Sequence, residues 1–162
     1  MDTILTIISA LCTGISLIGA YKSIKYYKKS KQLTIYANTN VCFTETQKII
    51  ATFTEILKLS NPSRLHRGTN TAKQLASYGE SIRGSMNIIR EKLPVEDFRE
   101  VEKYLSSSVV RVDAYIDSFI SGAILTEDKL IIDEKFNQCQ QKFYDIQQIL
   151  KHKLEEVEAK LS

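Results

Sequence analysis

The sequence predicts an all-α protein with a single N-terminal transmembrane helix followed by a cytoplasmic four-helix bundle. The first observation is a run of 19 residues without a charge, from Thr3 to Tyr21, which as a helix spans about 28 Å and matches the hydrocarbon core of a bilayer. The second is the spacing of apolar residues by threes and fours through the rest of the chain, which is typical of amphipathic helices. With only two prolines and six glycines in 162 residues, an all-β fold or long disordered segments are not expected.

The distribution of charge divides the chain into two predicted parts, 1–31 and 32–162. The first part holds five lysines and one aspartate, a net charge of +4, while the second holds 17 basic and 18 acidic residues, a net charge of −1. Lysines that follow the apolar run place the C-terminal part in the cytoplasm and the N-terminus outside. They also argue against a cleaved signal peptide, whose positive charge comes before the apolar run. Because the excess charge lies beside the apolar run, direct nucleic-acid binding is not expected.

Tyrosines and lysines flank the apolar run in the way that membrane-interface residues do. Tyrosine rings favour the headgroup level, and lysines there attract anionic lipid. Membrane lipid is therefore one predicted partner. The predicted interface residues are Tyr21, Lys22, Lys25, Tyr26, Tyr27, Lys28, Lys29 and Lys31.

One face of the predicted membrane helix is polar. At 100° per residue, six small or polar side chains fall within an arc of about 80°. They are Asp2, Thr6, Ser9, Thr13, Ser16 and Ala20. Two interpretations stay open, because such a stripe suits close packing of helices and also suits the lining of a wet pore. A conducting pore needs a ring of more than four helices, and about eight is our estimate.

The remaining chain predicts four helices joined by short connections. The first begins near Thr39 or Asn40, after the polar stretch 32–40, and ends at Asn61-Pro62. The second follows N-cap candidates at residues 69–71 and is closed by Pro94. Buried against one another, such apolar stripes form an antiparallel bundle.

The third and fourth predicted helices occupy the C-terminal half. The third runs from Pro94, with Glu96 and Asp97 complementing its dipole, to Gly122. The fourth starts at Thr126-Glu127-Asp128 and continues to Leu161. Its long apolar series also suits a projecting coiled-coil arm.

No sequence motif announces a reaction, a cofactor or a metal. Three widely spaced cysteines, Cys12, Cys42 and Cys139, form no metal-ligand pattern and suit small buried residues in a reducing compartment. Phosphate-binding loops, nucleophile elbows and metalloprotease motifs are absent from the sequence. The only candidate ligand site is a basic loop, in which Arg64, His66 and Arg67 could hold an anion or an RNA phosphate. A solvated loop is the alternative, and we read His152 as a solvated helix residue.

The layout of one N-terminal span, a lysine-rich junction and a helical bundle resembles the membrane-anchored accessory proteins of type VI-B CRISPR systems. The soluble part of these proteins is similar to the helical nucleotide-binding (HEPN) domain. Nuclease members of that class carry an arginine four to six residues before a histidine, and neither His66 nor His152 has one. The resemblance implies a non-enzymatic partner of an RNA-guided ribonuclease that assembles into a ring in the bacterial inner membrane.

Three functions follow from these observations as hypotheses. The leading one is an oligomeric effector of antiviral defence that forms a pore, depolarises the inner membrane and enhances the ribonuclease. The second is a membrane-tethered HEPN-like ribonuclease that uses the loop at Arg64, His66 and Arg67. The third is a passive membrane-anchored scaffold or adaptor that pairs with a partner helix.

Overall fold

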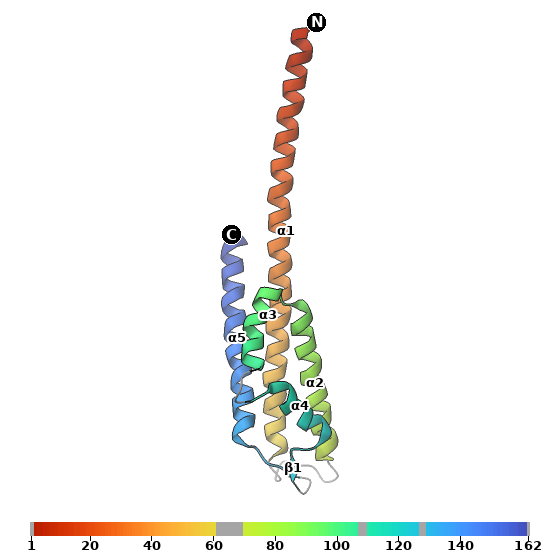
Figure 1. Ribbon diagram of the computed structural model, residues 1–162, viewed down its shortest axis with the longest axis vertical. Coiled ribbons are helices and arrows are strands. Elements are labelled where there is room, and N and C mark those ends of the chain that lie inside the picture. The colour runs from red at the N-terminus through yellow and green to blue at the C-terminus, as the bar shows by residue number, and fades with distance from the viewer. Residues whose placement is uncertain (1, 61–69, 107–109, 127–128, 162) are drawn as a thin grey trace.

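Helices make up nearly all of the computed structural model, which describes residues 2–60, 70–106, 110–126 and 129–161, with side chains from Thr13 onward. Five helices and one short hairpin form the described part (Figure 1). The hairpin is antiparallel and pairs Leu125 with Leu130. In chain order the elements are α1 (Asp2–Leu59), α2 (Thr71–Lys92), α3 (Val95–Leu105), α4 (Val112–Ser121), β1 (Leu125–Thr126), β2 (Lys129–Leu130) and α5 (Glu134–Leu161).

Helix α1 is a single helix of 58 residues, about 87 Å long at 1.5 Å per residue. Neither proline nor glycine occurs between Ala20 and Leu59, so nothing in that stretch interrupts helical hydrogen bonding. The predicted helix start near Thr39 or Asn40 is therefore wrong, because the polar stretch 32–40 is a continuous part of α1. The N-terminal end of α1 extends far beyond the other helices (Figure 1). We call residues 2–31 of α1 the arm.

The C-terminal part of α1 is the central element of the bundle. Helices α2 and α5 pack along it, α4 packs on α2, and α3 packs on α5. Phe53 of α1 lies at the centre of an aromatic cluster, and its ring centroid is 5.1 Å from that of Phe136 and 5.7 Å from that of Phe143. Phe119 of α4 closes the cluster at 6.2 Å from Phe53. Burial of these rings makes this region the apolar core.

Helix α4 lies close against α2 at a position where α2 has no side chain. A Cβ placed on Gly79 would stand 3.1 Å from Phe119 Cβ and 3.3 Å from the backbone nitrogen of Ile120. Arg90 of α2 donates to both carboxylate oxygens of Asp113 at 2.8 Å, and Arg83 pairs with Asp117. The close approach and the two ion pairs fix how α4 sits on α2.

Several predicted helix ends are confirmed. Asn70 is the N-cap of α2, and its side chain accepts a hydrogen bond from the backbone N–H of Lys73 at 2.8 Å. Leu93 is the C-cap of the same helix, immediately before Pro94. Gly122 ends α4 with a φ of 73°, a left-handed conformation that glycine adopts without steric cost.

The predicted third and fourth helices need correction. The stretch from Pro94 to Gly122 forms two helices, because α3 ends at Leu105 and α4 begins only at Val112. Thr126 belongs to strand β1, and α5 starts at Glu134. Asp133 provides the start signal for α5, since its carboxylate accepts a hydrogen bond from the backbone N–H of Phe136 at 2.9 Å. The bundle therefore contains five helices instead of four.

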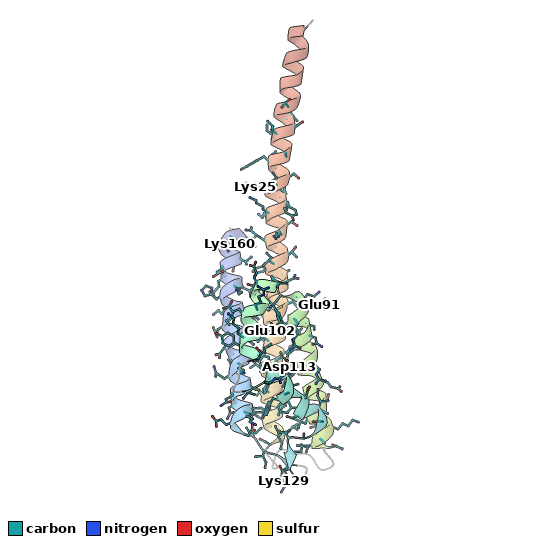
Figure 2. All side chains as sticks on the ribbon, in the orientation of Figure 1. Lys25, Glu91, Glu102, Asp113, Lys129 and Lys160 are labelled. Atoms are coloured by element: carbon teal, nitrogen blue, oxygen red, sulfur yellow. The ribbon has the colours of Figure 1, made fainter. Side chains whose placement is uncertain are left out.

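Helix α5 does not project alone as a coiled-coil arm. It runs along α1 for its whole visible length and ends beside the base of the arm (Figure 1). Figure 2 places Lys160, near the end of α5, slightly below Lys25 of α1. The last apolar residues of α5, Leu154, Val157 and Leu161, are half-buried.

The predicted transmembrane helix requires a larger correction. Among the residues that the structure describes, no helix is long and apolar enough to cross a membrane. This finding contradicts the single N-terminal transmembrane helix and the single-pass location in the bacterial inner membrane.

Candidate functional site

The arm is the part of the described molecule that most resembles a binding surface. Its large apolar side chains stand in solvent, with exposed fractions of 70% for Ile15, 67% for Leu17 and 60% for Ile18. At 100° per residue these three side chains point in different directions around the helix. Large apolar side chains exposed together on one element indicate an interaction site.

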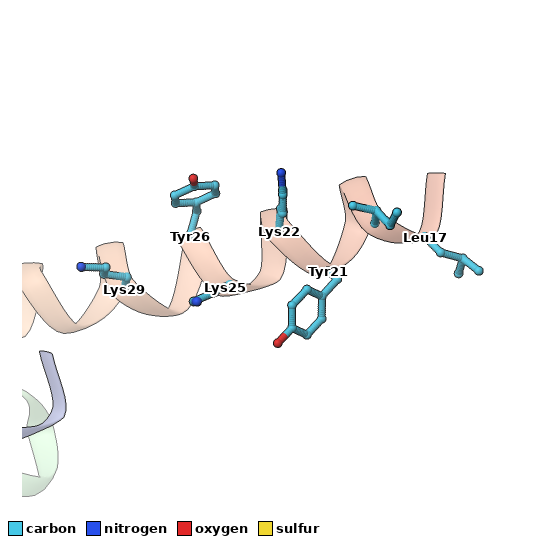
Figure 3. A pocket seen from close by; sticks show the side chains of 7 residues that line it. Leu17, Tyr21, Lys22, Lys25, Tyr26 and Lys29 are labelled. Atoms are coloured by element: carbon cyan, nitrogen blue, oxygen red, sulfur yellow. The ribbon is translucent and has the colours of Figure 1, made fainter. Parts of the chain in front are cut away.

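Aromatic and basic side chains follow these apolar residues toward the bundle. Tyr21, Tyr26 and Tyr27 are each about 70% exposed. Figure 3 shows Tyr21 and Tyr26 pointing outward from the helix on different sides. All residues that line this surface belong to α1, so it is an open helix face and not an enclosed cavity.

Three of the lysines share one side of the arm. Lys22, Lys25 and Lys29 fall within an arc of about 60° at 100° per residue. Neighbouring charges of the same sign at spacings of three and four residues repel each other and weaken the helix by about 0.2–0.5 kcal/mol per pair. We call the run of residues 22–31, with its five lysines, the lysine collar. Among the described residues, no ion pair joins the collar to an acidic side chain.

The predicted interface residues are all exposed on α1. None of their side chains is buried against the bundle, and the structure brings them together as neighbours along one helix. They are Tyr21, Lys22, Lys25, Tyr26, Tyr27, Lys28, Lys29 and Lys31.

The predicted hydroxyl stripe lies only partly within the described residues. Thr13, Ser16 and Ala20 are exposed on the arm. The side chains of Asp2, Thr6 and Ser9 lie outside the described residues, as does the whole predicted basic loop with Arg64, His66 and Arg67. Gly14 and Gly19 belong to the same stretch, and a Cβ on either would meet nothing within 4 Å. Small side chains and open space let another helix approach closely.

The core contains a buried polar cluster that the sequence did not indicate. Glu45 of α1 is 7% exposed, and its Oε2 accepts a hydrogen bond from the Ser85 hydroxyl of α2 at 2.7 Å. Its Oε1 lies 2.5 Å from Lys48 Nζ. The hydrogen bond from Lys48 holds the pKa of Glu45 below its usual value, against the opposing effect of burial, and Ser85 adds to the lowering. Glu45 and Ser85 are 40 positions apart, so only the folded chain shows that they meet.

The buried thiols have no features of reactive cysteines. Cys42 and Cys139 are fully buried and free of disulfides. Burial raises the pKa of Cys42 to about 11 and that of Cys139 to about 12, so both remain protonated at neutral pH. Their position in the core agrees with the prediction that they act as small apolar residues. Within the described residues, no group of His, Cys, Asp and Glu is arranged to hold a metal ion.

Comparisons with known proteins leave the resemblance without support. The chain matches no protein-family model, no curated protein and no solved structure. The resemblance to type VI-B CRISPR accessory proteins therefore stays a prediction.

Proposed function

We propose that this protein is a non-enzymatic assembly protein, in which the arm of α1 associates with the arms of further copies. The observation that carries the proposal is the exposure of the apolar residues of the arm, which no part of the described chain covers. An isolated helix is marginal in water, and most helix stability in proteins comes from packing of an apolar face. A helix arm without tertiary contacts therefore gains stability when another helix covers it.

The distribution of residues along the arm limits where copies can touch. The stretch from Thr13 to Tyr21 has no charge and includes the small residues Gly14, Ser16, Gly19 and Ala20. Helices can approach closely there, whereas collars placed side by side would repel one another. We therefore place the contact at 13–21 and leave the lysine collar at the surface of the assembly.

This proposal retains only part of the predicted function. The predicted pore depended on a helix that crosses a bilayer, and it is not carried further. Self-association by itself does not require that helix, whereas the predicted size of more than four copies, near eight, was estimated for the pore and stays an untested prediction. Contact with membrane lipid, enhancement of an RNA-guided ribonuclease and the alternative ribonuclease activity also stay predictions.

Measuring the mass of the full chain in mild detergent tests the proposal. We expect a homo-oligomer, and we expect Gly19→Leu to shift it toward monomer because a bulky side chain holds neighbouring helices apart. Gly84→Leu is the matched control, since Gly84 is also an exposed helical glycine with open space around it. A monomeric wild type, or equal masses for wild type and Gly19→Leu, would contradict the proposal.

A second measurement distinguishes two possible partners of the arm, a second copy of the chain and membrane lipid. The same proteins are mixed with vesicles of neutral lipid and of anionic lipid and then floated on a density gradient. Oligomers that form without vesicles support the proposal. Protein that is monomeric in detergent and floats only with vesicles would identify lipid as the partner and would overturn self-association.

A further inference from the structure

A hollow of about 390 Å³ lies where α4, the chain that follows it and the start of α5 meet. Pockets of about 300–1,000 Å³ are the size that binds small organic molecules. Arg111, Ala114, Tyr115 and Ser118 line it from α4 and its N-cap, and they share one side of that helix by spacing. The acidic residues of α4 lie elsewhere, because Asp113 and Asp117 pair with arginines of α2.

Hydrogen bonds fix one wall of the hollow. Tyr115 is 8% exposed, and its hydroxyl donates to Asp133 Oδ1 at 2.7 Å. The same oxygen accepts from the backbone N–H of Phe136 at 2.9 Å. Burial and then the Asp133 carboxylate raise the pKa of Tyr115, so the phenol stays protonated and continues to donate. The Asp133 carboxylate is thus engaged by two donors, which reduces its repulsion of an anion.

Positive charge reaches the hollow from two different elements. Arg111 stands at the start of α4 and Lys135 in the first turn of α5, and both side chains line the hollow. Among the described residues, neither has an ion-pair partner. A third cation is close, because Lys142 Nζ donates to the carbonyl oxygen of Val110 at 2.6 Å. Among the described residues that line the hollow, two cations stand against one engaged carboxylate, which makes this a positive site.

Apolar side chains form the remainder of the lining. Val110, Ala114 and Ile124 contribute aliphatic groups to the lining. Ala114 is exposed and Ile124 is half-buried, so an inorganic ion would leave them in contact with water, whereas a ligand with an apolar body would cover them. The charged and apolar parts of the lining thus select different parts of one ligand.

We propose that this hollow binds a small organic anion, with its carboxylate between Arg111 and Lys135 and its apolar body against Val110, Ala114 and Ile124. A guanidinium and an ammonium both form charge-assisted hydrogen bonds with a carboxylate, and Arg111 can do so with two parallel bonds. The site is independent of the arm. Failure of the self-association proposal therefore does not affect it.

Isothermal titration calorimetry of the full chain with benzoate, hexanoate and benzamide tests the proposal. We expect saturable binding of at least one carboxylate, and at least tenfold weaker binding of benzamide, which has the shape of benzoate without its charge. The double variant Arg111→Gln/Lys135→Gln should weaken carboxylate binding at least tenfold. The control Arg99→Gln/Lys151→Gln removes the same charge from exposed positions outside the hollow and should bind as the wild type does.

Three results would overturn the proposal. The first is that neither carboxylate shows saturable binding. The second is that benzoate and benzamide bind with equal affinity. The third is that the site variant and the control variant lose the same amount of carboxylate affinity. Inorganic phosphate is the fourth probe, and phosphate binding as tight as that of the carboxylates would refute the role of the apolar lining. Circular dichroism melting curves of both double variants show that each is folded, which assigns any loss to the site.

Discussion

The two ends of α1 belong to one helix and yet depend on different interactions. In the bundle, Ile49, Phe53 and Ile56 follow one another at spacings of four and three and are fully buried. In the arm, Ile15, Leu17 and Ile18 are 60–70% exposed, and they point to different sides. The first pattern is satisfied within one chain, whereas no described part of the chain covers the second. Continuous helical structure therefore does not imply uniform stability along α1.

The largest expected effect comes from the centre of the bundle. Phe53→Ala removes the ring around which Phe119, Phe136 and Phe143 gather, and it should lower the free energy of unfolding by about 3–5 kcal/mol. In the monomer, Leu17→Ala in the arm should change it by less than about 0.5 kcal/mol, because no described part of the same chain covers Leu17. Urea unfolding followed by circular dichroism, at one protein concentration, measures both. Similar losses in the two variants would mean that the arm packs within its own monomer.

The next effect concerns the buried carboxylate of α1. Glu45→Ala leaves the buried Ser85 hydroxyl without its acceptor and should cost about 1–3 kcal/mol at pH 7. The control is Glu55→Ala, because Glu55 pairs with Lys58 at 2.6 Å in the same i, i+3 geometry but is about half exposed. That substitution should cost less than about 0.5 kcal/mol.

The cost of Glu45→Ala should also depend on pH. The pKa of Glu45 is lowered in the folded state from its usual 4.5, so the ionised carboxylate stabilises the fold fully above pH 4.5. This contribution is lost as the pH falls from 4.5 through the lowered folded pKa. Unfolding curves of wild type and variant at pH 7 and pH 3 should therefore lie closer together at the lower pH. A gap that widens in acid would refute the role given to the carboxylate.

Two glycines of α2 should respond in opposite directions. Gly84→Ala places a methyl group in open space and should stabilise the protein by about 0.5–1 kcal/mol through helix propensity. Gly79→Ala places it against Phe119 and the backbone of Ile120, where overpacking costs about 1–3 kcal/mol. The net change at Gly79 should be destabilising by up to about 2 kcal/mol. Thermal melts of both variants check this, and equal stabilisation would show that α4 is not held close to α2.

The smallest effect belongs to the lysine collar. Replacing Lys22, Lys25 and Lys29 with glutamine removes like-charge neighbours, and it should change the free energy of unfolding by less than about 0.5 kcal/mol. The substitutions should raise the free energy of unfolding at low salt, and this gain should vanish at high salt because exposed charges are screened. Urea unfolding at two salt concentrations measures this. A loss above 1 kcal/mol would show that the collar contacts the bundle.

Local signals in the sequence predicted most of the helices and some of their ends. Asn70 was predicted from a side chain that caps helices and Gly122 from the conformational freedom of its backbone; both signals act over a few residues, and the structure confirms both helix ends. The predictions were wrong where contacts between elements distant in sequence determine the ends of a helix. The apolar spacing from Phe98 to Phe119 continues across the break between α3 and α4, yet α3 packs on α5 and α4 packs on α2. Periodicity alone cannot show that two halves of one pattern pack on different partners.

The candidate sites divide in the same way. The exposed lysines and tyrosines of the arm were predicted, because they are neighbours in sequence as well as in space. The pair Tyr115 and Asp133, the pair Glu45 and Ser85, and the positive hollow at Arg111 and Lys135 were not predicted. Their members lie 18 to 40 positions apart, and each residue alone is unremarkable.

The sequence by itself determined the helical character of the chain, the concentration of positive charge in residues 1–31 and the uncharged stretch before the lysines. These properties depend on residue type and local spacing, which folding does not change. Tertiary structure decided that α1 is continuous through 32–40, that α3 and α4 separate and that α5 ends beside the arm. Each of those outcomes depends on which apolar surface is buried against which, a free-energy balance among distant residues.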